Sequence, residues 1–119
     1  MHTFFSKTIF TYSHDNSILA VAKKIVDGAA VDSLVWDYLD AKKPVNTSLI
    51  RIIKKSEPYG IPPVVVPKDL DPALKKELQD ILLTMHEDQT GKKILQEIMI
   101  DRFVKVEDSL YDSIRKMTP

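Results

Sequence analysis

Apolar residues recur at helical spacing in several stretches of the chain, and each stretch follows side chains that can cap a helix N-terminus. The helices predicted in this way begin near Ser13–Asn16, Asp32–Ser33, Asp71, Asp88–Thr90 and Asp108–Ser109. Proline directly after Asp71 strengthens the third start, because proline is favoured in the first helical turn. The first helix is expected to end at Gly28.

Short apolar segments rich in β-branched and aromatic residues separate these helices. Such segments favour strands, which we expect over residues 4–12, 29–31, 48–55 and 64–66. The segment 29–31 is wholly apolar, as is typical of a strand covered on both faces. The resulting order is β-α-β-α-β, followed by a proline-marked crossing strand and C-terminal helices. This order predicts an α/β fold with helices covering a sheet.

A change of composition between Glu57 and Pro63 indicates a boundary within the chain. Proline, glycine and tyrosine interrupt the regular periodicity there. We therefore expect residues 1–57 and residues 58–119 to belong to different structural parts. The total length of 119 residues is normal for one domain.

The charge balance excludes some classes of partner. Seventeen basic and seventeen acidic residues give a net charge of zero. Nucleic-acid binding needs a basic face, so a nucleic-acid partner is not expected. No apolar run has the length of a membrane span, and no long apolar segment follows the first residues. We therefore expect no signal peptide within this chain.

The residues needed for several kinds of catalysis are missing from the sequence. The chain has no cysteine, only three glycines, and three widely separated histidines. A thiolate site, a glycine-rich phosphate loop and a clustered metal site are therefore not expected. No nucleophile–base pair is visible either. The sequence thus predicts a protein that is not an enzyme and has neither cofactor nor metal.

Two polar turns fall where a predicted strand ends and a predicted helix begins, the edge at which open α/β sheets bind ligands. The first contains Ser13 and His14, which can donate hydrogen bonds to an anion at a helix N-terminus. The second contains Asp32, whose carboxylate can accept from a ligand hydroxyl, amine or protonated oxygen. Ser13 and Asp32 can equally serve as ordinary helix caps, with His14 pointing to solvent.

Tyr59 and Gly60 form a third candidate, because glycine allows close approach of a ligand and tyrosine offers a ring and a hydroxyl. A simple turn explains the same pair of residues. The candidate ligand-binding residues are therefore Ser13, His14, Asp32 and Tyr59.

Four sequence motifs resemble the phosphonate/phosphite/phosphate-binding periplasmic proteins of ABC importers. They are F-T-Y-S-H-D-N-S-I, V-D-G-A-A-V-D-S-L-V-W-D-Y-L, Y-G-I-P-P-V-V-V-P-K-D-L and M-H-E-D-Q-T-G-K-K-I-L. They occur in the order found in that family, and the resemblance covers the chain from about Phe4 to Met117.

The resemblance implies a two-lobed solute-binding fold with the ligand in a cleft between the lobes. Family members are more than twice as long, so this chain resembles their C-terminal part. Residues 1–57 would be the later portion of the second lobe, and residues 58–119 the return segment and C-terminal helices that complete the first lobe. The family's oxyanion-contacting histidine maps to His14, its cleft-facing acidic residue to Asp32, and its hinge loop to the region of Tyr59.

Aromatic residues of the first lobe and a serine- and threonine-rich helix N-terminus in that family have no counterpart here. The resemblance therefore implies one wall of a cleft, with weak or absent phosphonate binding by this chain alone. It also implies a small oxyanion ligand, an ABC permease as partner and a periplasmic or extracytoplasmic location for the parent protein.

Other functions remain open on the sequence. The same fold also serves as the extracytoplasmic ligand-sensing domain of signalling proteins, and a small stand-alone interaction protein is a further alternative. A truncated sheet would leave apolar faces and strand edges uncovered, so we expect a homodimer.

Overall fold

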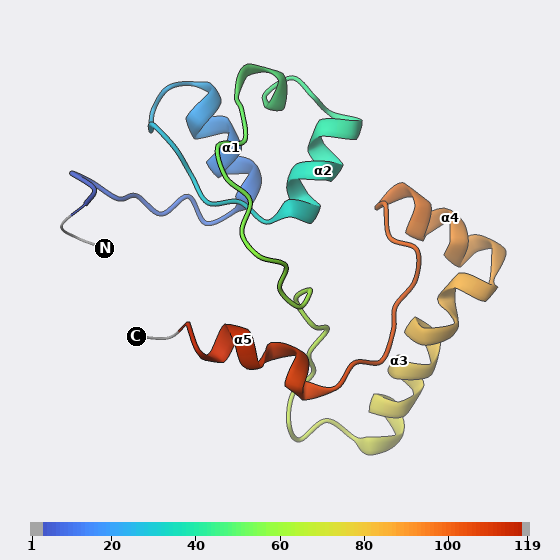
Figure 1. Cartoon of the computed structure of the whole chain (residues 1–119). Coiled ribbons are helices and arrows are strands. Elements are labelled where there is room, and N and C mark those ends of the chain that lie inside the picture. Colours follow the sequence, from blue (N-terminus) through green and yellow to red (C-terminus); the bar gives the residue numbers. More distant parts are fainter. Residues whose placement is uncertain (1–3, 118–119) are drawn as a thin grey trace. The chain divides into compact units, whose positions relative to one another are not determined.

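The computed structural model describes residues 4–117, and within this range all regular secondary structure is helical (Figure 1). By contact, the chain divides into two units, Met1–Lys55 and Ser56–Pro119. The first unit contains α1 (His14–Ala22), α2 (Ser33–Lys42) and the 3₁₀ helix η1 (Thr47–Leu49). The second contains α3 (Pro72–Thr84), η2 (Met85–Glu87), α4 (Gln89–Glu97), η3 (Asp108–Tyr111) and α5 (Asp112–Arg115).

The predicted α/β fold is wrong, because no residue between 4 and 117 lies in a strand. Of the segments expected as strands, 48–55 begins inside η1, and 29–31 and 64–66 have no regular structure. A strand is stabilised by hydrogen bonds to a neighbouring strand, and strand propensity alone is a weak preference. Among the described residues, the backbone hydrogen bonds outside helices join positions five or fewer apart. The apolar, β-branched segments therefore remain unpaired.

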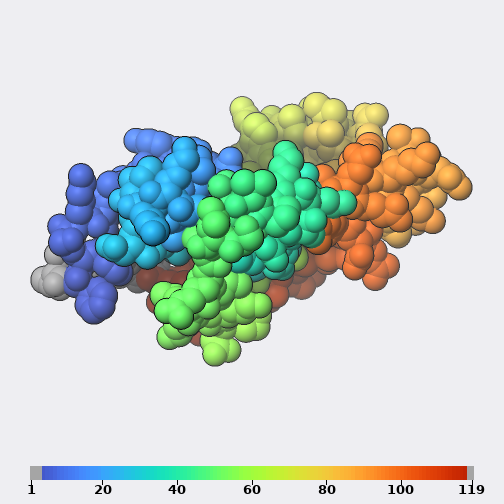
Figure 2. Space-filling model, turned by 90° about the horizontal axis from the view of Figure 1, so that it is seen from above, coloured from blue at the N-terminus to red at the C-terminus, as the bar shows by residue number. Residues whose placement is uncertain are grey.

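The first unit has a small core where α1 and α2 contact each other and η1 contacts both. Ile18 and Ala20 of α1 are buried there together with Thr47 of η1. In Figure 2 the blue residues of α1 and the teal residues of α2 flank the green segment that contains η1. The Thr47 hydroxyl is buried without a hydrogen-bond partner among the described residues. The Thr47 hydroxyl therefore lowers the stability of this core, since an unpaired buried hydroxyl is destabilising.

The second unit is built on a hairpin in which η2 connects α3 to α4. Leu95 of α4 is 1% exposed and forms the centre of its small core. Gly91 is also buried, and a β-carbon at this position would overlap the carbonyl oxygen of Met85. The hairpin therefore depends on glycine in the first turn of α4.

Helix capping follows the sequence closely. Asp71 accepts a hydrogen bond from the Leu74 N–H at 2.9 Å, and Asp88 accepts from the Gly91 N–H at 2.8 Å. The starts of α3 and α4 are thus confirmed, because these carboxylates satisfy N–H groups that have no partner within the helix.

Much of the apolar surface is uncovered. The accessible surface is 10663 Å², whereas two separate compact units of these sizes would together expose about 7,900 Å². Three apolar residues of α3 are more than a third exposed, and so are several large residues of the irregular segment after η1: Leu74, Leu78, Ile81, Ile52, Ile53, Ile61, Val64 and Val65.

Helix α1 ends earlier than the predicted stop at Gly28. Lys24 adopts a left-handed backbone with φ of 57°. Its N–H donates to the Val21 carbonyl at 2.9 Å, and the Ile25 N–H donates to the Ala20 carbonyl at 2.9 Å. This pair of bonds defines a Schellman C-cap, which glycine usually occupies. The left-handed backbone costs a non-glycine residue roughly 1–2 kcal/mol of free energy.

Replacing Lys24 with glycine should therefore stabilise the first unit, by about 1 kcal/mol after the flexibility of glycine in the unfolded chain is subtracted. Urea unfolding followed by circular dichroism measures the change. Lys23→Gly is the matched control, because Lys23 has φ of −82° and bears no such strain. Equal effects of the two substitutions would contradict this account of the helix end.

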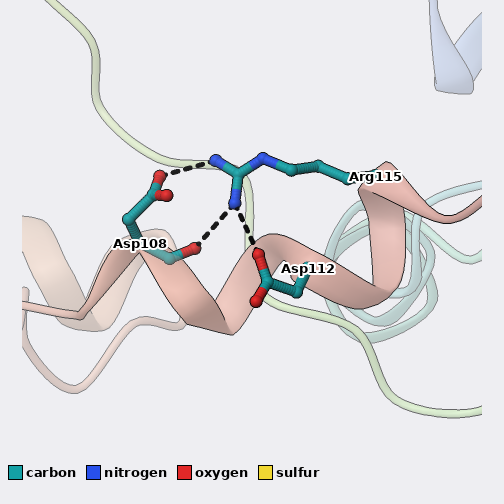
Figure 3. Close-up of polar contacts among 3 residues, drawn as sticks. All are labelled: Asp108, Asp112 and Arg115. Carbon is teal, nitrogen blue, oxygen red and sulfur yellow. Dashed lines mark hydrogen bonds and ion pairs between the residues drawn. The ribbon is translucent and has the colours of Figure 1, made fainter.

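An arginine bridges two carboxylates at the end of the second unit (Figure 3). Arg115 lies 2.6 Å from Asp108 Oδ1 and 2.8 Å from Asp112 Oδ1, and it also donates to the Asp108 carbonyl at 3.2 Å. The hydrogen bond from Arg115, aided by its charge, lowers the pKa of Asp108 below its ordinary value of 3.8. The same contact with Asp108 raises the pKa of Arg115. The cluster ties η3 to α5.

The stabilisation from Asp108 should be complete above pH 3.8 and should disappear as the pH falls through the lower pKa of the folded state. NMR titration of the Asp108 carboxyl carbon measures this pKa. Arg115→Gln should return it towards 3.8, and an unchanged titration in that variant would contradict the assignment to Arg115.

Candidate functional site

The segment before α1 is held by a network of short polar contacts. The Thr11 hydroxyl donates to the Ser13 carbonyl at 3.1 Å and lies 2.6 Å from the Ser17 hydroxyl. The Asn16 side-chain amide donates to the Thr11 carbonyl at 3.0 Å. These contacts close the turn that leads into α1, and they fix the positions of Ser13 and His14 at the start of the helix.

The two predicted polar turns meet at one hydrogen bond. The backbone N–H of Asp32 donates to Nδ1 of His14 at 3.3 Å. His14 is the first residue of α1 and Asp32 is the N-cap of α2. The fold thus brings together two of the candidate residues, eighteen positions apart, at adjacent helix N-termini.

This hydrogen bond determines the tautomer of His14. Nδ1 accepts a hydrogen bond, so a neutral imidazole must carry its proton on Nε2. Nε2 has no hydrogen-bond partner among residues 4–117, and the side chain is exposed. His14 therefore presents one free N–H donor beside the N-terminus of α1, where partial positive charge favours an anion.

Ser13 and Asp32 also act as caps of the helices that follow them. The Ser13 hydroxyl accepts from the Asn16 N–H at 3.4 Å. Asp32 Oδ1 accepts from the Leu34 N–H at 2.8 Å, which leaves its second oxygen as the available acceptor. Ser13 and Asp32 therefore cap helices, as the local sequence also allowed.

Asp15 modifies the electrostatics of this corner. A hydrogen bond from the Ser13 side chain is the main cause that lowers the pKa of Asp15 below 3.8. The Asp15 carboxylate also places negative charge near His14, which opposes anion binding.

An open hollow of about 320 Å³ lies on the same corner. Its wall combines four hydroxyl-bearing side chains and the His14 ring with apolar groups, and its lining residues are Ile9, Phe10, Thr11, Tyr12, Ser13, His14, Ser17 and Ala30. The hollow can receive a small molecule that pairs an oxygen-rich end with an apolar end.

Tyr59 lies in the second unit and its side chain is 41% exposed. Its assignment as a ligand contact stays a prediction. The neighbouring Gly60 packs against η3, since a β-carbon there would lie 3.0 Å from side-chain atoms of Leu110 and Tyr111. The Tyr111 hydroxyl donates to the Ile61 carbonyl at 3.0 Å. Gly60 therefore has a packing role.

A second hollow, of about 260 Å³, lies on the second unit between η2 and α4. Its charged lining residues, Lys92 and Asp101, have opposite signs. His86 also lines it, and its Nδ1 is buried without a hydrogen-bond partner among the described residues. Because that nitrogen is closed off from solvent, it offers nothing to a ligand.

No group of three or more histidine or acidic side chains in residues 4–117 could hold a metal ion. No helix in the same range has the length and apolar character needed to cross a membrane.

Sequence reasoning missed the residues that shape the corner. Thr11, Asn16 and Ser17 build its polar network, and Tyr12 lies in its wall. The density of hydroxyl and amide side chains in T-Y-S-H-D-N-S was the available signal.

The family described as "ABC transporter, phosphonate, periplasmic substrate-binding protein" matches residues 1–111 of the 119. This match confirms the expected resemblance and the expectation that the protein is not an enzyme. The family places its members outside the cytoplasm and implies phosphonate binding and delivery to an ABC transporter. The chain belongs to this family of periplasmic phosphonate-binding proteins of ABC transporters.

Proposed function

We propose that the corner formed by His14 and Asp32 is one wall of the ligand cleft of an importer's solute receptor. The observation that carries this proposal is the hydrogen bond from the Asp32 N–H to His14 Nδ1, because it directs the His14 Nε2–H outward as a donor. The ligand would be an oxyanion of the phosphonate class, with Ser13 as a second donor. Asp32 would accept from a protonated oxygen or an amine of the ligand.

The wall is incomplete as a binding site for a phosphonate. Ser13, His14 and Asp32 supply its polar groups, and the neighbouring Asp15 carboxylate is repulsive. A tetrahedral oxyanion needs more donors than these residues supply. We propose that residues outside this chain complete the cleft, and that residues 1–57 and 58–119 are parts of the second and first lobes of a longer receptor.

Binding by the chain alone should therefore be weak, with a dissociation constant of roughly millimolar or above. Titration of the ¹⁵N-labelled protein with methylphosphonate should shift the amide of Asp32 and the imidazole signals of His14. His14→Ala should weaken the affinity read from the Asp32 amide about tenfold, since it removes a hydrogen bond to a charged oxygen.

Asp15→Asn is the matched control, and it should strengthen binding because it removes the repulsive charge. Circular dichroism verifies that α1 persists in both variants. Micromolar affinity would contradict the incomplete cleft, and a titration that leaves Asp32 and His14 unaffected would contradict the site itself.

We also propose that the chain forms a homodimer, which the uncovered apolar surface of both units supports. Light scattering during size-exclusion chromatography measures the mass. A mass that stays monomeric at the highest attainable concentration would contradict this proposal.

A further inference from the structure

Tyr12 combines two features that are unfavourable for a tyrosine. Its backbone is left-handed, with φ of 64°, a conformation that strains a bulky side chain. Its side chain is 97% exposed, so the ring buries no apolar surface in return. Glycine would satisfy this backbone without strain.

The network of the corner holds Tyr12 in this conformation. Two hydrogen bonds of Thr11 span it. The Thr11 hydroxyl donates to the Ser13 carbonyl, and the Thr11 carbonyl accepts from the Asn16 side-chain amide. The surrounding contacts therefore over-determine the strained backbone, which is the condition under which such strain persists at functional sites.

Tyr12 lies beside the residues of the proposed cleft wall. Tyr12 lines the same hollow as Ser13 and His14, and Ile9 and Phe10 contribute apolar surface to it. The hollow that would hold an oxyanion at His14 therefore also offers apolar surface to an attached carbon chain. The exposed ring is available for that contact.

We propose that Tyr12 is a specificity-determining residue, whose ring packs against the organic substituent of the bound oxyanion. This inference rests on the proposed function of the His14 corner. Tyr12 selects oxyanions that carry a carbon chain over inorganic ones, because an aromatic ring gains from an apolar contact and offers little to an oxygen.

The test compares propylphosphonate with phosphite, two tetrahedral oxyanions that differ in the carbon chain. Both are titrated into the ¹⁵N-labelled full chain, with the Asp32 amide as the common readout and the Tyr12 ring protons as the specific one. In the unmodified protein, propylphosphonate should shift the ring protons and phosphite should leave them in place.

Tyr12→Gly should lower the preference for propylphosphonate roughly three- to tenfold, the size expected for one aromatic contact. Binding of phosphite should change little. Tyr12→Phe, which keeps the ring, should retain the preference. Thermal unfolding of Tyr12→Gly should occur at a higher temperature, because the substitution relieves the backbone.

The outcomes separate this inference from the function on which it rests. If both ligands shift Asp32 and the preference survives in Tyr12→Gly, the role of Tyr12 is wrong while the cleft wall stands. If the preference is lost in Tyr12→Phe as well, the ring contact is wrong. If neither ligand shifts Asp32, the cleft wall and the role of Tyr12 both fail.

Discussion

The hydrogen bond between the Asp32 N–H and His14 Nδ1 is the contact on which the candidate site depends. It joins the N-termini of α1 and α2, and it leaves the His14 proton on the outward-facing nitrogen. Thr47 and the buried side chains of α1 support the same helix pair, since η1 contacts both helices. The core of this unit is small, so its polar contacts have a large share in positioning the site.

The start of each longer helix could be predicted from the sequence because a helix start is a local property. Asp71 and Asp88 each bond an N–H three residues ahead, and no distant residue is needed for that bond. The strands could not be predicted in the same way. A strand needs a neighbour, and the segments 29–31 and 64–66 have none within the described residues.

Prediction of the site was likewise limited to its local features. Ser13, His14 and Asp32 stand out in the sequence because each precedes or begins a helix. That His14 and Asp32 contact each other could be inferred only through a sheet, which residues 4–117 do not form, and the contact arises instead from the packing of α1 on α2. The left-handed backbone of Tyr12 had no signal, since tyrosine is unusual there.

Gly91 has a consequence for how the second unit tolerates mutation. Because the Met85 carbonyl occupies the volume of a side chain at this position, even alanine would force η2 and α4 apart. Leu95 lies one helical turn further on and is the most deeply enclosed residue of this unit. Separation of the two backbones would expose the Leu95 side chain to water. A single added methyl group at position 91 would therefore disrupt the small core of the hairpin.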